Sequence, residues 1–529
     1  MSILPARIRT LGTSTQGVMS AAVLVAASLI LSRVIGLFRV SIFAALFGTS
    51  AQMADYNAAF RIPDLLFAVI AGGALSSAFV PVFAGLIERR REDEAWAIAN
   101  TVLNTLLITM IVLAVAAFIL APQLVDALVP KFTAAGKAET ANLTRIMLAQ
   151  PVLLGVGGLF AAMQNSYGRF VLPAVAPVLY NVVIVLGALL FGPHFGVYAA
   201  AWAVTAGALI MFEIQIWGVG PESSRYRPRM EWRLAGAREV LKLLGPRLLG
   251  LSAYQVMLLV TTYLASGLGS TGFNSISYAW TLLMFPVGAI GSSLGTAVFP
   301  TLARQTAGDQ RLQLRRTLRQ SLRGILFLAV PATIGLILLR RPIIVVLYGH
   351  GAWTPASTAA TAYALLFYSL GLAAMTLIEV IPRAFYALRN TRTPVMIAVV
   401  SLAVDIALSI ILIHTFPRSQ GQGGLAIATA VAVWLQAVWL MVALRPQIGG
   451  VLDREFLRAV MAIAAASLLM GVGVFVVARA SDVLLRTGTG FGALVEVVVG
   501  VSIGVAIYLG VARALKLPEI ERLGTMIRR

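Results

Sequence analysis

The chain has 529 residues, of which 59% are hydrophobic and only 12% are charged, and its mean hydropathy is +0.90. A soluble domain carries about 25% charged residues, so the composition excludes a soluble globular protein and indicates a polytopic membrane protein. The formal net charge of +20 does not predict a nucleic-acid partner, because the bases fall in short gaps between apolar spans. The sequence has no cysteine, which excludes disulfides, thiolate metal sites and cysteine nucleophiles.

Apolar runs of roughly 18 or more residues are long enough to cross the hydrocarbon of a bilayer. Counting them predicts an all-α fold with fourteen transmembrane helices. No cleavable signal peptide is predicted, because the first run continues past the length of a signal-peptide core. The predicted spans lie at about 17–47, 57–87, 97–120, 142–165, 173–192, 196–219, 239–266, 271–303, 316–347, 357–389, 393–416, 421–445, 455–479 and 489–515.

The gaps between these spans predict the orientation of the chain. Arginines follow the even-numbered spans, whereas the gaps 48–56, 193–196, 267–271 and 348–356 contain no Lys or Arg. Bases concentrate on the cytoplasmic side of a membrane. Both termini are therefore expected in the cytoplasm.

A similarity between two segments of the chain predicts two parallel repeats. GGALSSAFVPVFAGL at 72–86 resembles GSSLGTAVFPTLARQ at 291–305, and the alignment places Pro81 on Pro300. An even number of predicted spans separates the two copies, so the halves keep one orientation and enclose a central cavity, where such proteins hold substrates. The predicted domains are an N-lobe (1–219), a cytoplasmic linker (220–238), a C-lobe (239–446), and two further helices with a cytoplasmic tail (447–529).

Arg33, Arg39 and Arg61 sit in apolar surroundings. An arginine at the bilayer centre costs at least about 2.5–3.5 kcal/mol, so these predict a polar cavity; the alternative is that they snorkel to an interface. Arg33 and Arg39 are six residues apart and would not align on a straight helix, although Gly36 could permit a bend. The guanidinium group of arginine can form two parallel hydrogen bonds to phosphate oxygens, which predicts a phosphate-bearing substrate. Arg61 and Asp64 could pair on one helix face, a pair that could equally be structural.

Asp405 stands alone within the apolar run VVSLAVDIALSI. An acid at that depth is a functional candidate that could bind Na⁺ or take up a proton, with oxygens from Ser409 and from Thr261 and its neighbour Thr262. The alternative is an aspartate that is simply hydrogen-bonded inside the helix bundle.

Two further groups of charged residues lie in predicted spans. Glu379 and Arg383 are four residues apart and are predicted to pair. Glu496 has no evident role. No Gly-rich phosphate loop with lysine and no Ser/His/Asp set appears. The sequence therefore favours a transporter without nucleotide hydrolysis over an enzyme, and predicts no cofactor beyond a coupling ion.

Seven motifs, distributed in order along nearly the whole chain, resemble the MurJ/MviN-type lipid II flippases of the multidrug/oligosaccharidyl-lipid/polysaccharide exporter superfamily. They are SRVIGLFR (32–39), AFRIP (59–63), GALSSAFVPVF (73–83), NSYGRFVLPAVAPVLYN (165–181), LGTAVFPTLAR (294–304), VLYGHGAW (346–353) and AFYALRNTRTPV (384–395).

The resemblance implies a monomeric protein of the bacterial inner membrane. It also implies that this protein moves undecaprenyl-pyrophosphate-linked peptidoglycan precursor, lipid II, to the outer leaflet by alternating access. It implies a hydrophobic groove beside the last two spans for the lipid tail. The implied substrate-binding residues are Ser32, Arg33, Gly36, Arg39 and Asp55, to which Arg61 is added as a candidate. The implied cation site comprises Thr261, Asp405 and Ser409.

Several positions depart from the family pattern. An acid that the family places after its second arginine is replaced by Val40, and an Asp–Arg pair in the eighth span is replaced by Trp280 and Thr281. Phe67, Ala68 and Gly72 replace two arginines and a glutamate. Export of another polyprenyl-pyrophosphate-linked oligosaccharide and a non-transporting membrane scaffold therefore stay open as alternatives. A drug/cation antiporter is disfavoured, because a cavity rich in arginine repels organic cations.

Overall fold

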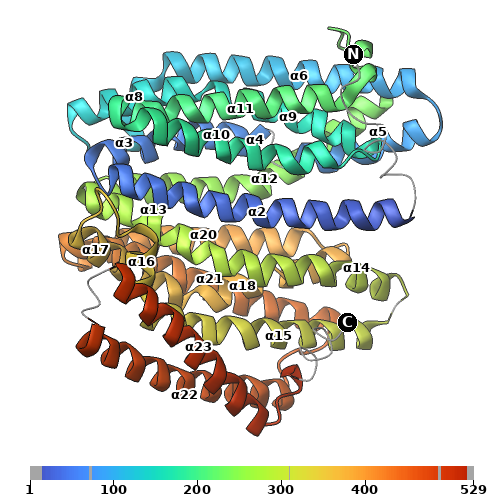
Figure 1. Cartoon of the computed structure of the whole chain (residues 1–529). Coiled ribbons are helices and arrows are strands. Elements are labelled where there is room, and N and C mark those ends of the chain that lie inside the picture. Colours follow the sequence, from blue (N-terminus) through green and yellow to red (C-terminus); the bar gives the residue numbers. More distant parts are fainter. Residues whose placement is uncertain (1–14, 71–73, 309, 486–489, 521–529) are drawn as a thin grey trace. The chain divides into compact units, whose positions relative to one another are not determined.

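The computed structural model describes residues 15–70, 74–308, 310–485 and 490–520 (Figure 1). Every regular element in these ranges is a helix, which confirms the predicted all-α class. The chain divides into two compact units, Met1–Ser266 and Gly267–Arg529. Each unit is described by itself.

The first unit contains helices α2 to α12 and the short 3-10 helix η2. Helix α10 packs against both α2 and α11, and α9 packs against α11. The bounds are α2 Thr15–Phe47, α3 Ala51–Ala59, α4 Arg61–Ile70, α5 Ala74–Glu88, α6 Glu92–Ile119, α7 Ala121–Leu128, α8 Ala134–Met147, α9 Ala149–Ser166, α10 Val171–Phe195, α11 Val197–Val219, η2 Gly220–Arg225 and α12 Ala235–Ala265.

The core of the first unit lies where α5, α6 and α9 meet. Phe79 and Phe83 stack with ring centroids 5.0 Å apart, and Phe83 meets Trp96 edge-on. The Trp96 indole N–H donates to the Tyr167 hydroxyl at 3.1 Å, so the polar edge of each aromatic side chain is satisfied within the core. These buried rings fix the ends of α5, α6 and α9 relative to one another.

The second unit contains helices α13 to α23 with two short irregular helices. Helix α13 packs on α17, α20 on α21, and α22 on both α15 and α23. The bounds are α13 Gly269–Pro286, the π-helix η3 Val287–Ser292, α14 Ser293–Ala307, α15 Arg311–Leu338, α16 Arg340–Tyr348, α17 Pro355–Leu370, α18 Leu372–Ile378, α19 Ile381–Ala387, α20 Arg392–Thr415, the 3-10 helix η4 Arg418–Gln420, α21 Gly421–Ile448, α22 Arg454–Leu485 and α23 Gly490–Ala514.

The helix bounds repeat along the chain. Helices α5 and α14 each carry a proline at their eighth position, Pro81 and Pro300. The same sequence separation lies between the first residues of α6 and α15 and between their last residues. It also lies between the first residues of α7 and α16. Nearly the same separation relates the start of α10 to the start of α20. Much of the second unit therefore repeats the succession of helices found in the first unit.

The number of membrane spans stays a prediction. Eleven helices in the described ranges are long and apolar enough to cross a membrane, and a twelfth is added if α17 and the pair α18–α19, bent by 51°, form one span. The two remaining predicted spans fall on α4–α5, which flank residues outside the described ranges, and on α12.

The division into units differs from the predicted C-lobe start at 239. Helix α12 packs with the first unit, against α4, α5 and α6. A small residue makes this contact close, because a Cβ added to Gly236 would lie only 2.4 Å from Ile98 Cδ1. The predicted boundary falls inside this helix, and the predicted division into lobes stays a prediction.

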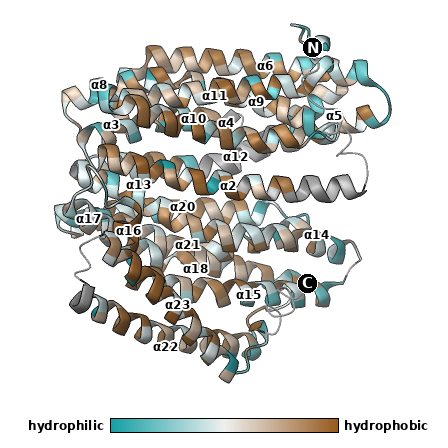
Figure 2. Ribbon diagram, viewed as in Figure 1, coloured by the Kyte–Doolittle hydropathy of each residue, from teal (hydrophilic) through white to brown (hydrophobic). Residues whose placement is uncertain are grey.

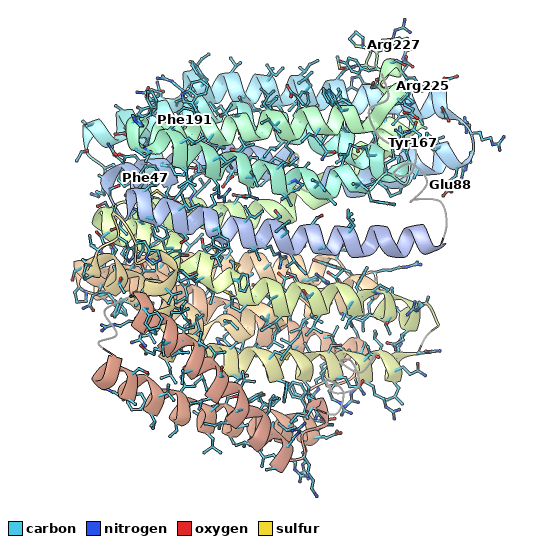
Figure 3. The ribbon with its side chains drawn as sticks, in the orientation of Figure 1. Phe47, Glu88, Tyr167, Phe191, Arg225 and Arg227 are labelled. Atoms are coloured by element: carbon cyan, nitrogen blue, oxygen red, sulfur yellow. The ribbon has the colours of Figure 1, made fainter. Side chains whose placement is uncertain are left out.

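Polar and apolar residues separate along the helices. Apolar residues dominate the long helices, and polar residues gather at turns such as the one between α5 and α6 (Figure 2). In the first unit, Glu88, Tyr167, Arg225 and Arg227 lie at one end of the helices, whereas Phe47 and Phe191 lie at the other (Figure 3). This is the distribution of a multi-pass membrane protein.

Candidate functional site

The first group of predicted site residues lies on α2, which runs unbroken from Thr15 to Phe47. The α-helix continues through Gly36, the residue at which the sequence could permit a bend. Six residues of straight helix separate Arg33 and Arg39 by about 240° around the axis. Arg33 is accordingly exposed and Arg39 half-buried, so only one of the two faces the interior of the first unit.

Arg39 lies among polar residues from three other helices. It interacts electrostatically with Asp64 on α4, with Tyr56 on α3 and with Tyr180 on α10. Arg61 also interacts with the Asp64 carboxylate, although the two side chains form no ion pair at direct contact distance. We call Arg39, Tyr56, Arg61, Asp64 and Tyr180 the arginine cluster. It brings two cations and one acid together inside the first unit.

The arginine cluster keeps unused hydrogen-bonding groups. The Arg61 Nε is buried and has no partner among the described residues. Gln150, at the start of α9, donates through its amide nitrogen to the Tyr180 hydroxyl at 3.3 Å, and its buried amide oxygen has no partner in the described ranges. A buried polar group without a partner costs about 1–3 kcal/mol. Such groups are retained where a ligand satisfies them.

Two other predicted residues of this group, Ser32 and Asp55, have hydrogen-bonding partners outside the cluster. Ser32 accepts a hydrogen bond from the Asn181 amide at 3.3 Å and thereby joins α2 to α10. Asp55 is buried against α8, where the Thr140 hydroxyl donates to its carboxylate at 3.4 Å. A Cβ at Gly136 would lie 3.0 Å from the same carboxylate oxygen. Asp55 is thus hydrogen-bonded to α8, whereas Asp64 interacts electrostatically with the two arginines.

The second predicted site lies on the face of α20 that packs against α21. Ser401, Asp405 and Ser409 are all buried on this face at intervals of four residues. The Thr429 hydroxyl of α21 donates to Asp405 Oδ1 at 3.3 Å, and Ser409 also hydrogen-bonds to the Asp405 carboxylate. The buried Ser401 hydroxyl has no partner in the described ranges. We call these four residues the Asp405 site.

The chemistry of the Asp405 site suits a cation or a proton. It combines one carboxylate with three hydroxyl oxygens, and no basic side chain is among its hydrogen-bonding partners in the described ranges. Hard cations prefer such oxygen ligands, and an unpaired buried carboxylate also favours uptake of a proton. Thr261 belongs to the first unit, and its assignment to this site stays a prediction. The neighbouring Thr262 hydroxyl donates to the Leu258 carbonyl at 2.7 Å.

The repeat provides an internal reference for Asp405. When the starts of α10 and α20 are aligned, Asp405 and Ser409 correspond to Ile184 and Ala188 on α10, and both of these are fully buried. Helix α10 packs against α11 as α20 packs against α21. The fold therefore forms this helix pair with an apolar residue where the second unit has an acid. Packing alone does not require Asp405.

The predicted pair of Glu379 and Arg383 is confirmed, with 3.7 Å between Arg383 Nη2 and Glu379 Oε2. Each partner is held by a hydroxyl on the facing segment: Ser292 donates to Glu379 at 3.2 Å, and Arg383 donates to Thr296 at 3.1 Å. Glu496, to which the sequence assigned no role, is buried in α23. The Glu379–Arg383 pair thus joins the end of α18 to η3 through Ser292, and joins α19 to α14 through Thr296.

Sequence reasoning missed Tyr180, Gln150 and Thr429. Tyr180 and Gln150 carry no charge and stand in ordinary apolar spans, so no local pattern singles them out. Thr429 becomes relevant only because α21 folds back on α20. Each of these residues became a candidate only because of a contact between helices.

The chain matches the protein family described as lipid II flippase MurJ over residues 8–489. A lipid II flippase MurJ from Burkholderia cenocepacia is 31% identical over 424 residues, which cover 79% of this chain and 81% of the relative. A probable lipid II flippase MurJ from Bdellovibrio bacteriovorus is 30% identical and covers 96% of both chains.

Two solved structures share the fold. A lipid II flippase MurJ in an inward closed conformation superimposes with a TM-score of 0.77 at 23% identity, covering 93% of this chain and 99% of that one. An inward-facing multidrug resistance transporter of the same superfamily superimposes with a TM-score of 0.64 at 16% identity, covering 84% of this chain and 98% of that one.

Proposed function

Because the chain belongs to the lipid II flippase MurJ family, we propose that it moves lipid II from the cytoplasmic to the outer leaflet by alternating access. The membrane in question is the bacterial inner membrane, with both termini in the cytoplasm. The substrate is a saccharide–peptide linked to a polyprenyl tail through a pyrophosphate. Its polar head cannot cross hydrocarbon unaided, because each unpaired polar group costs several kcal/mol there.

The arginine cluster is the observation that carries this proposal. Two guanidinium groups interact electrostatically with one carboxylate, so the cluster retains excess positive charge, and the buried Arg61 Nε lacks an acceptor among the described residues. A pyrophosphate supplies both the missing negative charge and the missing acceptors, and arginine binds phosphate oxygens through paired hydrogen bonds. We assign the phosphate contacts to Arg39 and Arg61, with Tyr180 and Gln150 as further hydrogen-bonding groups. Arg33 is exposed and contributes less.

The Asp405 site supports the assignment of a coupling ion to this transport. Its carboxylate is buried among hydroxyls, with no basic side chain of the described ranges hydrogen-bonded to it. We assign Asp405, Ser409, Thr429 and Ser401 to Na⁺ or H⁺, whose entry and release would bias the alternation between conformations. An ion can shift such an equilibrium only by its difference in affinity for the two states.

Complementation tests the proposed transport. The chain is expressed in a bacterium whose own lipid II flippase is depleted, and restored growth is the expected result. Arg39→Gln should abolish rescue at equal membrane expression, because an amide cannot supply the charge or the paired donors. The matched control is Arg316→Gln, which removes an exposed arginine that belongs to neither site. Failure of the wild-type chain to restore growth would refute lipid II as its substrate.

A further inference from the structure

The connection between η2 and α12 forms an exposed basic surface whose role the transport cycle does not explain. It comprises Tyr226, Arg227, Pro228, Arg229, Met230, Glu231, Trp232 and Arg233, and we call it the 226–233 segment. The segment lies at the end of the first unit that also carries Glu88 and Tyr167 (Figure 3). It has no regular secondary structure apart from turns.

Buried amides of α6 hold the backbone of this segment. Asn104 donates to the carbonyls of Arg227 and Arg229 at 3.0 and 2.9 Å, and Asn100 donates to the carbonyl of Arg225 at 3.2 Å. The Thr101 hydroxyl accepts from the Glu231 N–H at 3.0 Å. An irregular backbone can lie beside lipid only if the protein satisfies its polar groups. The segment meets this requirement through α6.

The same contacts place the segment at the boundary between polar and apolar surface. Thr105 on α6 donates to the Met230 sulfur at 3.8 Å. The exposed apolar surface of α6 begins one turn further along, at Ile108, and continues through Ile111 and Val112. Met230 and Trp232 are 47% and 38% exposed at this level. Amphipathic aromatic side chains concentrate at the membrane–water interface.

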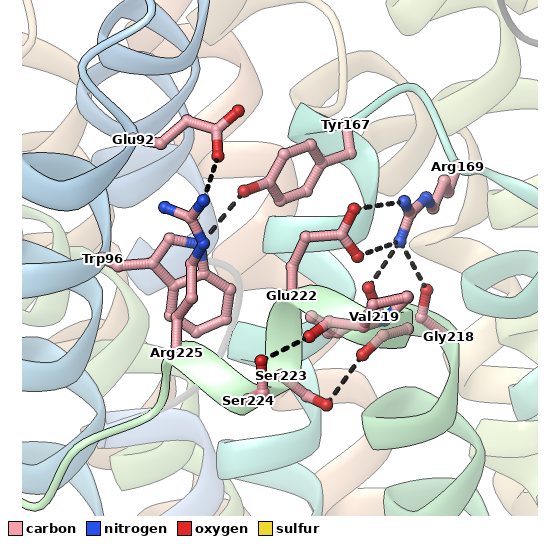
Figure 4. A network of polar contacts seen from close by, with 12 residues as sticks. Glu92, Trp96, Tyr167, Arg169, Gly218, Val219, Glu222, Ser223, Ser224 and Arg225 are labelled. Atoms are coloured by element: carbon pink, nitrogen blue, oxygen red, sulfur yellow. Dashed lines mark hydrogen bonds and ion pairs between the residues drawn. The ribbon is translucent and has the colours of Figure 1, made fainter.

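The charges at this end of the unit fall into two groups. Arg169 pairs with Glu222 at 2.7 Å, and Arg225 pairs with Glu92 at 3.0 Å (Figure 4). Arg225 also pairs with Asp93 at 3.0 Å. These arginines are neutralised within the protein. By contrast, the exposed side chains of Arg229 and Arg233 make no hydrogen bond or ion pair in the described ranges. Arg227 donates only to backbone carbonyls, of Ser224 and Tyr226.

We propose that the 226–233 segment binds the anionic phospholipid headgroups of the membrane surface. Its three arginines outnumber its one glutamate, and none of the three is paired with an acid in the described ranges. Each basic residue near an anionic membrane surface contributes about 1 kcal/mol to binding. Met230 and Trp232 insert at the hydrocarbon boundary while the arginines contact phosphates. This binding is separate from the pyrophosphate contacts assigned to Arg39 and Arg61.

Lipid titration of the full-length chain tests the proposal. The purified protein in detergent is titrated with phosphatidylglycerol or phosphatidylcholine, and bound lipids are counted by native mass spectrometry. The triple variant Arg227→Gln, Arg229→Gln and Arg233→Gln should bind phosphatidylglycerol about a hundredfold more weakly, with phosphatidylcholine binding unchanged. Replacing the same residues with lysine should retain binding, because a charged surface does not require the guanidinium fork.

A charge-matched control removes three exposed arginines of the second unit, Arg316, Arg392 and Arg458. This control should weaken phosphatidylglycerol binding by less than twofold. Unchanged phosphatidylglycerol binding in the 226–233 glutamine variant would overturn the proposal. Equal losses in the test and control variants would also overturn it, because binding would then follow net charge alone.

Discussion

The helix pairs α10–α11 and α20–α21 occupy corresponding places in the two units, yet they are filled differently. On α10 the buried positions are Ile184 and Ala188, and on α20 they are Asp405 and Ser409. Burying an acid without a basic partner is costly, whereas burying isoleucine is favourable. The first unit shows that this helix pair also forms with apolar residues at these positions. The acid in the second unit is therefore best explained by function.

The candidate sites of the two units also differ in the sign of their charge. The first unit carries Arg39 and Arg61 around a single acid, and the second carries Asp405 among hydroxyls. A repeated scaffold thus presents one site suited to an anion and another suited to a cation. The following predictions are designed to break or to sharpen this contrast.

Removing the charge at Asp405 should have the largest effect. Asp405→Asn keeps the shape and the hydrogen bond from Thr429, but it cannot bind a cation or take up a proton. We expect stimulation of flipping by an ion gradient to disappear in proteoliposomes, while basal flipping persists. Ser401→Ala should weaken the stimulation only partly. Full gradient stimulation in the Asp405→Asn variant would exclude Asp405 as the coupling group.

Exchanging the residues of the two helix pairs should have unequal effects on stability. Ile184→Asp places an uncompensated acid between α10 and α11 and should destabilise the protein by about 3–5 kcal/mol. Asp405→Ile should leave thermal unfolding unchanged or raise its midpoint. Ile184→Val is the control and should cost about 0.5–1.5 kcal/mol. A large loss of stability in Asp405→Ile would show that Asp405 is structural.

The amides of α6 should make a moderate contribution. Asn104→Ala leaves the carbonyls of Arg227 and Arg229, and the Tyr226 hydroxyl that donates to Asn104 at 2.7 Å, without their partner. The expected loss is about 1–3 kcal/mol, with faster hydrogen exchange in the 226–233 segment. Asn142→Ala is the control, because Asn142 is exposed. Equal exchange in the two variants would contradict the role assigned to α6.

A second aspartate of the second unit should contribute least. Asp453 accepts from the Phe456 N–H at 2.8 Å and pairs with Arg319, and these contacts lower the pKa of its carboxyl. Its stabilisation is therefore present above the unfolded pKa and is lost as the pH falls through the folded one. The surface pair is worth at most about 1 kcal/mol. Asp453→Asn should reduce the loss of stability in acid, and an unchanged acid profile would contradict this.

Long apolar runs made the helices predictable, and the repeated proline of α5 and α14 pointed to their repeated succession. Asp405 was identifiable because an acid in an apolar run has a cost that can be estimated from sequence. Asp64 was expected only to pair with Arg61, and Asp55 was expected at the substrate. Their surroundings depend on which helix packs against α3 and α4, and a single sequence does not contain that information.

Pyrophosphate binding tests the central claim most directly. Undecaprenyl pyrophosphate is titrated against the purified wild-type chain, against Arg33→Gln, and against the double variant Arg39→Gln and Arg61→Gln. The arginine cluster predicts at least about tenfold weaker binding in the double variant, and a smaller loss in Arg33→Gln. Wild-type affinity in the double variant would show that the diphosphate is held elsewhere.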